Sequence, residues 1–176
     1  MRKSTGQRQI KVILVMALTA DGFTARFSNE YTDWSSAADK KLFLEISKKA
    51  GVVIMGKNTY NTLKSPLKNR LNIVMGKNDI NQVEKNLRFF SGDPLLLLEE
   101  LENQGFKEAV LCGGASTNTV FFEKDAIDEA VFTISPLMFG KGISVFNTKI
   151  NCRLFLEECK KIDKNTIMLR YLFNKE

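Results

Sequence analysis

The segment that decides the fold spans residues 50–60 and reads A-G-V-V-I-M-G-K-N-T-Y. Residues 52–55 form a short apolar run of β-branched character, which is typical of a strand buried on both faces. Gly56 ends this run, and residues 57–59 are predicted to open a short helix. A strand that leads through glycine into a helix presents free N–H groups, so we expect an anion site there. An ordinary turn with a solvated lysine is the alternative interpretation.

The composition limits the chain to a few classes of protein. With 176 residues, 44% of them apolar, we expect one domain with a sizeable core. The chain has no histidine, which excludes histidine general bases, catalytic triads and histidine metal ligands, and no metal site is predicted. The three cysteines, Cys112, Cys152 and Cys159, match no zinc or redox spacing. They are expected to be reduced and to act as small core residues.

Residues 1–9 are polar and basic, and we interpret them as an N-terminal extension to a single domain at residues 10–176. They contain no signal-peptide core, and the longest apolar run, residues 12–18, is too short to cross a bilayer. A cytoplasmic protein without a membrane partner is therefore expected. The net charge is +6, but the lysines are scattered, so small anionic ligands are favoured over nucleic acid.

Strand-like and helix-like segments alternate along the rest of the chain. Strands are predicted at residues 10–19, 71–75, 87–90, 109–112 and 128–134. Helices are predicted at residues 35–49 and 94–104, and a further helix follows the paired glycines and ends at about residue 123. A hairpin at residues 153–161 and 166–173 closes the chain. Residues 23–34 are polar and aromatic without a period, as expected of a functional lid. The alternation predicts an α/β fold, a three-layer α/β/α arrangement with a mostly parallel central sheet and an antiparallel C-terminal hairpin.

Asp39 has an unusual place in the predicted helix at residues 35–49. It stands three, four and seven residues before Leu42, Phe43 and Ile46, which places it within the buried stripe. An ionised carboxylate without a partner costs several kcal/mol there, so Asp39 needs a partner or a ligand. Alternatively, Ser36 and Asp39 form a capping box on the first helical turn. The spacing leaves both interpretations open.

Three glycine breaks fall at the carboxyl ends of predicted parallel strands: Gly56-Lys57, Gly76-Lys77 and Gly113-Gly114. Ligands of such sheets bind beyond these strand ends. The paired glycines allow close approach of the backbone, and Ser116 is predicted to cap the helix that follows them. Together the three breaks favour a site for an anionic ligand at one rim of the sheet.

These segments resemble the dihydrofolate reductase superfamily over nearly the whole chain. Trp34, Asp39 and Phe43 keep the spacing of that family's tryptophan, acidic residue and phenylalanine, and V-I-M-G-K-N-T-Y and S-P-L-K-N-R-L-N-I-V resemble its V-I-M-G-R-x-T-W and P-L-P-G-R-x-N-I-V segments. In the second half, L-C-G-G-A-S-T-N and D-E-A-V-F-T-I-S-P-L-M-F-G-K-G are similar to the reductase domain of riboflavin biosynthesis. That branch reduces a phosphorylated diaminopyrimidinone.

The resemblance implies roles for the substrate-binding residues. Asp39 would hold the pyrimidine ring of a pterin and support protonation, and Thr133 would hydrogen-bond that carboxylate, so both are candidate catalytic residues. Phe43 would flank the ring, Arg70 would bind the carboxylate of a glutamate tail, and Cys112 is counted with the substrate-binding residues.

The resemblance also implies NADPH as the cofactor. Ala17 would lie by the nicotinamide. The residues expected near the phosphates are Gly56, Lys57, Asn58, Thr59 and Lys77, and those expected to cradle the pyrophosphate are Gly113, Gly114, Ala115, Ser116 and Thr117. Lys57 and Lys77 take the basic or polar positions that meet the 2′-phosphate, which favours NADPH over NADH.

The predicted function is NADPH-dependent reduction of 7,8-dihydrofolate to tetrahydrofolate. The alternative is a riboflavin-type reductase of a phosphorylated diaminopyrimidinone, although the aspartate-proline-threonine-arginine segment that binds the substrate phosphate in that branch is missing. Ala115 and Asn69 also replace glycines common in dihydrofolate reductases. A pterin- or nucleotide-binding protein without turnover, or a basic nucleic-acid binder, would be of another class. Both a monomer and a homodimer remain open.

Overall fold

The computed structural model describes residues 8–77 and 84–174. In this part of the chain the elements follow in the order β1 (Lys11–Thr19), α1 (Ala37–Ala50), β2 (Val52–Gly56), α2 (Lys57–Asn61), β3 (Leu71–Met75), β4 (Leu87–Phe90), α3 (Pro94–Asn103), β5 (Glu108–Leu111), α4 (Ala115–Glu123), β6 (Glu129–Ser135), β7 (Leu154–Lys161) and β8 (Ile167–Phe173). None of the helices in these residues is both long and apolar enough to traverse a lipid bilayer.

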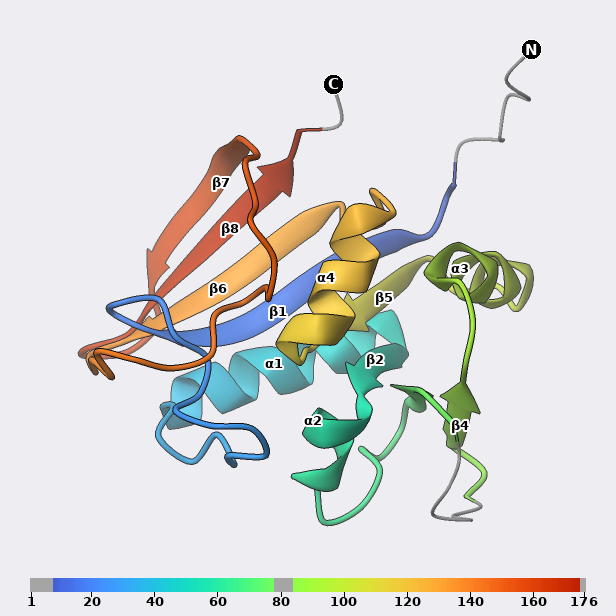
Figure 1. Cartoon of the computed structure of the whole chain (residues 1–176), viewed down its shortest axis with the longest axis horizontal. Coiled ribbons are helices and arrows are strands. Elements are labelled where there is room, and N and C mark those ends of the chain that lie inside the picture. The colour runs from blue at the N-terminus through green and yellow to red at the C-terminus, as the bar shows by residue number, and fades with distance from the viewer. Residues whose placement is uncertain (1–7, 78–83, 175–176) are drawn as a thin grey trace.

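One twisted sheet carries the fold, with the strand order β4-β3-β2-β5-β1-β6-β8-β7 (Figure 1). All neighbours from β4 to β6 are parallel, whereas β8 is antiparallel to both β6 and β7. Helices cover both faces, so the predicted three-layer α/β/α architecture with an antiparallel C-terminal hairpin is confirmed.

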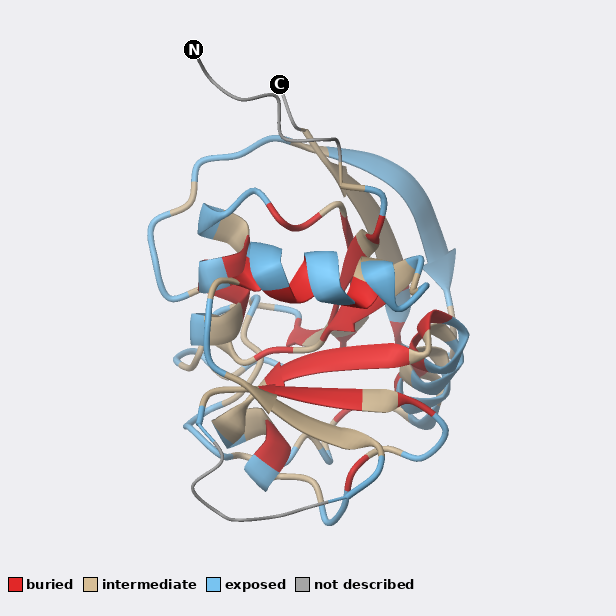
Figure 2. Cartoon of the chain, turned by 90° about the vertical axis from the view of Figure 1, so that its right-hand side faces the viewer, coloured by how far each residue is buried: buried red, intermediate tan, exposed pale blue. Residues whose placement is uncertain are grey.

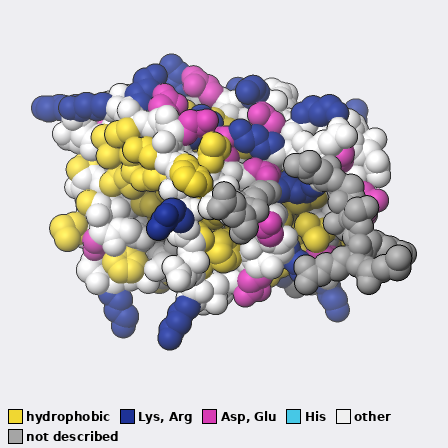
Figure 3. Space-filling model, turned by 90° about the horizontal axis from the view of Figure 1, so that it is seen from above, with side chains coloured by type: hydrophobic (Ala, Val, Ile, Leu, Met, Phe, Trp, Pro, Cys, Tyr) yellow, Lys and Arg dark blue, Asp and Glu magenta, His cyan; other side chains and the backbone are white. Residues whose placement is uncertain are grey.

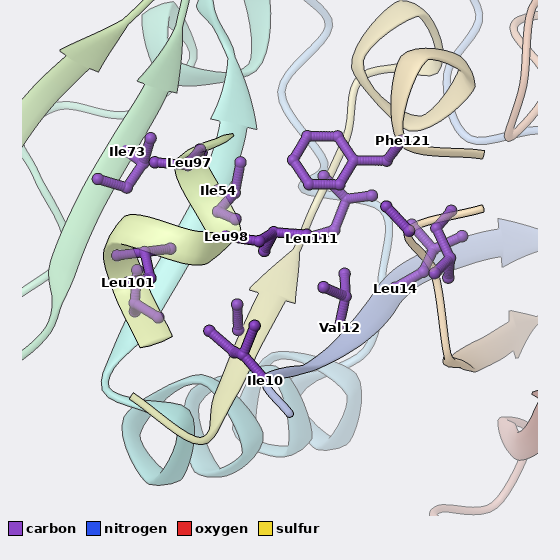
Figure 4. Packing of buried hydrophobic residues seen from close by; sticks show 14 of the residues in the cluster. Ile10, Val12, Leu14, Ile54, Ile73, Leu97, Leu98, Leu101, Leu111 and Phe121 are labelled. Atoms are coloured by element: carbon purple, nitrogen blue, oxygen red, sulfur yellow. The ribbon is translucent and has the colours of Figure 1, made fainter. Parts of the chain in front are cut away.

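Side chains alternate between two cores because successive residues of a strand point to opposite faces. The core on the α3 and α4 side holds residues such as Leu14, Ile54, Leu98 and Phe121 (Figure 4). The core on the α1 side holds Val53 and its neighbours, and the apolar residues of α1 pack against it. Figure 2 colours most of the inner strands, such as β2, as buried. Each fully buried leucine contributes roughly 1.5–3 kcal/mol of transfer free energy.

The ends of the helices follow local chemistry. Ser36 is the N-cap of α1 and its side chain accepts a hydrogen bond from the Asp39 N–H, while Gly51 ends α1 in the left-handed conformation at φ 76°. Asp93 caps α3 in front of Pro94. Gly114, not Ser116, is the N-cap of α4. The prediction for Ser116 is wrong because α4 starts at Ala115, two residues earlier than a cap at Ser116 requires.

The cysteines and the N-terminal extension differ in part from what the sequence predicts. Cys152 and Cys159 are exposed, so they are not core residues, whereas Cys112 is half-buried against the α1-side core. Cys159 is exposed because β7 is the last strand of the sheet. Of the basic extension at residues 1–9, residues 1–7 lie outside the described part. The Arg8 guanidinium donates to the Asp128 carboxylate at 3.0 Å, so the extension is anchored at its last residues.

Candidate functional site

A buried carboxylate lies at the start of α1, facing the sheet. Asp39 is 8% exposed, and its Oδ1 accepts a hydrogen bond from Thr133 Oγ1 of β6 at 2.5 Å. The Ser36 hydroxyl accepts from the Asp39 backbone N–H at 3.1 Å, so the backbone of Asp39 completes the cap while its side chain turns to the sheet. The backbone of Asp39 therefore takes part in capping α1, while Oδ2 of its carboxylate is placed to accept a hydrogen bond from a ligand.

One face of α1 carries a row of functional groups. Asp39, Phe43 and Ser47 are spaced four residues apart, and side chains at this spacing lie above one another. Ser47 Oγ donates to the Phe43 carbonyl at 2.6 Å and accepts from the Arg70 guanidinium. At about 1.5 Å per residue, Ser47 lies about 12 Å along the helix from Asp39. The row thus places a carboxylate, an aromatic ring and a cation in succession.

Arg70 is 6% exposed, and its Nε also donates to the Lys68 carbonyl at 3.1 Å. Loss of solvation by burial lowers the pKa of the guanidinium, with a small opposing influence of Cys112. Burial of the Cys112 thiol raises its pKa to about 12, and the positive charge of Arg70 only partly opposes this rise. Cys112 is therefore a neutral thiol that shapes the site and is not a nucleophile.

A cavity of about 510 Å³ opens at the carboxyl ends of the strands. It is bordered by the first residues of α2 and α4, by the lid and by the loop after β6. Its lining residues are Met16, Thr24, Ala25, Phe27, Ser28, Asn29, Glu30, Thr32, Gly56, Lys57, Asn58, Thr59, Thr62, Met75, Cys112, Gly114, Ala115, Ser116, Thr117, Ile143 and Asn147. This volume lies within the range of about 300–1,000 Å³ that is usual for ligand pockets.

Glycines allow α2 and α4 to approach each other beneath this cavity. A Cβ atom added at Gly56 would overlap Thr117 Oγ1 and come within 3.5 Å of the Gly114 nitrogen. A Cβ at Gly114 would come within 3.5 Å of Thr59 Oγ1. Two helix N-termini thus direct N–H groups and short polar side chains at one cavity, and this arrangement fits the phosphates of a dinucleotide. The described residues contain no group of three or more His, Cys, Asp or Glu side chains fit to hold a metal ion.

Comparison with known proteins assigns the family. The sequence model described as Dihydrofolate reductase matches residues 11–134, from β1 to the end of β6 except its last residue. The chain belongs to the dihydrofolate reductase family. Over 170 residues it is 23% identical to the uncharacterized protein YwjB of Bacillus subtilis (strain 168), covering 92% of this chain and 97% of that protein.

Solved structures of two branches of the family share the fold. RibD of Acinetobacter baumannii superposes with a TM-score of 0.77 at 20% identity, over 96% of this chain and 59% of RibD. A dihydrofolate reductase from Enterococcus faecalis, complexed with NADP(H), superposes with a TM-score of 0.74 at 19% identity, over 95% of this chain and 98% of that chain. At these identities the likeness establishes the fold alone, and the fold is shared with both branches.

Most residues that the sequence assigns to a cofactor border the cavity: Gly56, Lys57, Asn58, Thr59, Gly114, Ala115, Ser116 and Thr117. Ala17 instead lies opposite Thr133 in the β1–β6 register, on the Asp39 side of the sheet. Gly113 is not in the lining, and a Cβ added there would come within 3.3 Å of Met16. Lys77 is exposed beyond the end of β3. Among the described residues these three are outside the cavity lining.

The sequence interpretation missed Met16, whereas the segment that it predicted as a lid does border the cavity. Met16 points to the α4 face because its neighbours in β1 point to the other, and strand alternation could have revealed this. Seven cavity-lining residues come from the predicted lid, at positions 24, 25, 27, 28, 29, 30 and 32. Asn58 Nδ2 donates to Ser28 Oγ at 3.1 Å, so the lid contacts the first turn of α2.

The loop after β6 holds the lid in place. Asp21, two residues before the lid, accepts hydrogen bonds from the Thr19 hydroxyl at 2.6 Å and from the N–H groups of Phe139 at 3.0 Å and Gly140 at 2.7 Å. Ala25 and Ile143 form an antiparallel bridge. The Phe139 ring makes an edge contact with Trp34, and the Arg26 guanidinium lies 4.1 Å from its centroid. We refer to these contacts as the clasp.

The Asp21 carboxylate is expected to make the clasp sensitive to acid. Its pKa lies below the ordinary value of 3.8, chiefly because of the Thr19 hydroxyl and also because of the Phe139 and Gly140 N–H groups. Since the folded-state pKa is lowered, the contribution of Asp21 is present above pH 3.8 and is lost as the pH falls through the lowered pKa. We expect the Gly140 amide proton resonance to move upfield in that acidic range, as measured by NMR titration. In the Asp21→Asn variant this titration should be absent, and its persistence would contradict the assignment.

Proposed function

We propose that the protein is an NADPH-dependent reductase and that its substrate is 7,8-dihydrofolate. The observation that carries this proposal is the buried Asp39 carboxylate, held by Thr133 on the face of α1 that also presents Phe43. A carboxylate with one oxygen occupied by a hydroxyl can accept hydrogen bonds from the N–H edge of a pyrimidine ring through the other. Phe43, one helical turn away, would pack on the ring.

The residues around the cavity would hold the cofactor. Gly114 and Thr117 would hold the pyrophosphate at the start of α4, and Lys57 and Thr59 would contact phosphate at the start of α2. Bound NADPH would supply the hydride, so no protein nucleophile is needed. The lid residues that line the cavity would exclude water from the reacting rings.

The remaining task for the protein is to assist one proton. Asp39 provides a carboxylate on the face of α1 that would meet the substrate. It would orient the pyrimidine ring so that the ring nitrogen beside the hydride acceptor can be protonated. A positioned acid or base contributes about 10²–10⁴-fold to such a step. Asp39 is therefore the group on which turnover should depend most.

A phosphorylated diaminopyrimidinone is the second candidate substrate. The fold is shared with RibD reductase domains, and the segment from Asp128 to Gly142 resembles that branch and includes the clasp residues Phe139 and Gly140. Such a substrate has a pyrimidine ring that Asp39 could hold, with a phosphate where the folate carries its glutamate carboxylates.

An NADPH-oxidation assay with both substrates side by side tests the proposal. We expect oxidation of NADPH, followed by its absorbance, to depend on 7,8-dihydrofolate and to yield tetrahydrofolate. Turnover of the pyrimidinone alone would assign the riboflavin-type activity. Tight NADPH or pterin binding without turnover of either would identify a binding protein, and strongly salt-dependent affinity for random duplex DNA would identify a nucleic-acid binder.

Arg70 is expected to distinguish the folate from smaller substrates. Replacing it by leucine removes the cation at the end of the α1 row, so the KM for dihydrofolate should rise by about 100-fold, given about 1.5–3 kcal/mol for a charge-assisted hydrogen bond. The kcat should fall much less, because Ser47, the α1 residue that Arg70 contacts, lies about 12 Å along the helix from Asp39. Steady-state kinetics measures both, and an unchanged melting temperature would separate this effect from damage to the Ser47 contact. A wild-type KM would refute the folate assignment.

Gly56 is expected to control cofactor affinity. In the Gly56→Ala variant the new methyl group overlaps Thr117 Oγ1, so Thr117 must rotate away and the phosphate cradle is distorted. We expect the Kd for NADPH to rise about tenfold, equivalent to about 1.4 kcal/mol, as measured by quenching of Trp34 fluorescence or by calorimetry. The matched control is Thr117→Ala alone, which removes the hydroxyl without adding a methyl group at Gly56 and so measures the contribution of that hydroxyl by itself. If the Gly56→Ala variant binds NADPH like the wild type, this part of the cavity does not hold the cofactor.

A further inference from the structure

The sheet ends in a long, exposed edge strand. All residues of β7 from Phe155 to Lys161 are exposed (Figure 2), and β8 is the neighbour with which β7 pairs in the described structure. The opposite edge strand, β4, is half the length and half-buried. A free edge presents unpaired N–H and C=O groups that can bind another strand. The β7 edge is therefore the part of the sheet best placed to accept one.

The α4-side face beside this edge is apolar. The strand register places Leu156 opposite Tyr171, and Cys159 opposite Leu169. Leu169 in turn lies opposite Phe132 of β6, whose ring contacts Tyr171 at 6.3 Å. Leu156 is 57% exposed. Figure 3 shows hydrophobic side chains gathered on the side of the molecule where Figure 1 has β7 and β8. A partner at the β7 edge would extend this apolar face.

The charges of β7 specify what kind of partner fits. The exposed segment reads Glu157-Glu158-Cys159-Lys160-Lys161, with two acidic and two basic residues at equal distances from Cys159. In an antiparallel pair of two identical strands centred on Cys159, Glu158 lies opposite Lys160 of the other copy, and Glu157 lies opposite Lys161. Every charge then meets its opposite, and by symmetry each pair occurs twice.

Other registers lose these pairs. If the two-fold axis moves by half a residue along β7, one acidic–basic pair remains on each side of the axis. If it moves by a full residue in either direction, no acidic–basic pair within the segment remains. Parallel pairing in register sets like charges against each other. Charged side chains and the β-bulge between Leu156 and Glu158 are features that usually protect an edge from other strands. Here the same charges would reject foreign strands and accept a second copy.

We propose that the protein forms a two-fold symmetric homodimer in which the β7 strands of two copies pair antiparallel about Cys159. This joins two eight-stranded sheets into one continuous sheet and leaves the cavity at the strand ends open in each copy. The interface is independent of the proposed activity. It places the two Cys159 residues directly opposite each other, with Cα atoms about 4.5–5.5 Å apart, within the span of about 4.4–6.8 Å that a disulfide needs.

Light scattering coupled to size exclusion, together with oxidative cross-linking, tests the dimer. The full chain should elute with the mass of two chains. Mild oxidation with copper phenanthroline should give a covalent dimer on a non-reducing gel, in which each of two thiols loses one proton and one electron to the oxidant. The Cys152→Ser variant should cross-link like the wild type, and Cys159→Ser should not. A monomeric mass, or cross-linking that depends on Cys152 instead, would overturn the proposal.

Charge reversal provides the second test and controls for folding. Lys160→Glu with Lys161→Glu makes the segment wholly acidic and should weaken dimerisation on the order of 100-fold, because four cross-strand pairs change from attractive to repulsive. Adding Glu157→Lys and Glu158→Lys restores self-complementarity in the opposite sense and should restore the dimer. If the chain with all four substitutions stays monomeric, or if the Lys160→Glu, Lys161→Glu variant dimerises like the wild type, the proposed register is wrong.

Discussion

Replacing Asp39 by asparagine is expected to lower kcat with dihydrofolate by about 100- to 10,000-fold near neutral pH, the usual contribution of a positioned acid or base. The amide keeps the size of the side chain and can still accept the hydrogen bond that Thr133 Oγ1 donates to Oδ1. It cannot carry the negative charge that holds the ring and supports protonation. Affinity for NADPH should change little, because Asp39 is not among the residues lining the 510 Å³ cavity.

Two variants control this prediction. Asp33→Asn removes the same charge from an exposed position in the lid and should leave kcat within a factor of two or three, since exposed charges contribute little. Thr133→Val removes one charge-assisted hydrogen bond, which corresponds to a loss of about tenfold or more. Stopped-flow hydride transfer and NADPH titration measure the two quantities separately. Equal losses of turnover, NADPH affinity and thermal stability would make Asp39 a structural helix cap and would refute the catalytic role.

Replacing Glu129 by glutamine is expected to cost about 3 kcal/mol of folding free energy. Glu129 begins β6, is fully buried, and pairs with Lys11 Nζ of β1 and with the Arg170 guanidinium of β8. Removing one member of a buried ion pair costs about 3–5 kcal/mol because the opposite charge is left uncompensated. We expect the lower end because the side chains of Lys11 and Arg170 are 41% and 26% exposed. The melting temperature should fall by about 6–12 °C for a chain of this size.

The matched control is Glu158→Gln, which breaks the exposed pair with Arg170 at 3.6 Å and should cost no more than about 1 kcal/mol. A second control replaces all three charges, as Lys11→Met, Glu129→Leu and Arg170→Met, and should recover much of the loss because no buried charge remains unpaired. Differential scanning calorimetry measures each melting temperature. A Glu129→Gln variant that melts like Glu158→Gln would show that the buried carboxylate contributes no more than a surface pair.

The order of the elements was predictable because it depends on local patterns. The apolar run at residues 52–55, the proline at the start of α3 and the alternation at residues 153–161 and 166–173 each indicate their element without reference to the rest of the chain. The exposure of Cys152 and Cys159 was not predictable from such patterns. An apolar alternation identifies a strand but does not say whether another layer covers it, and the outer strand β7 is left uncovered.

Part of the candidate site also followed from the sequence. The glycine breaks at Gly56 and Gly114 predicted the rim where the cavity lies, because parallel strands end on the same edge. The clasp was not foreseen, since Asp21 and Gly140 are distant in the sequence and hydrogen bonds between two loops leave no periodic pattern. Met16 was missed because the resemblance pointed to Ala17, its neighbour on the opposite face of β1.

The sequence by itself determined the α/β class, the mostly parallel sheet, the helix that starts after Gly56 and the placement of Asp39 in an apolar stripe. These follow from the periods of side chains in helices and strands and from the backbone freedom of glycine. Only the tertiary structure decided between the two interpretations of Asp39, because Thr133 comes from a strand ninety-four residues away. The burial of Arg70, the closure of the lid and the free edge at β7 likewise depend on which elements become neighbours, and packing of the whole chain sets that.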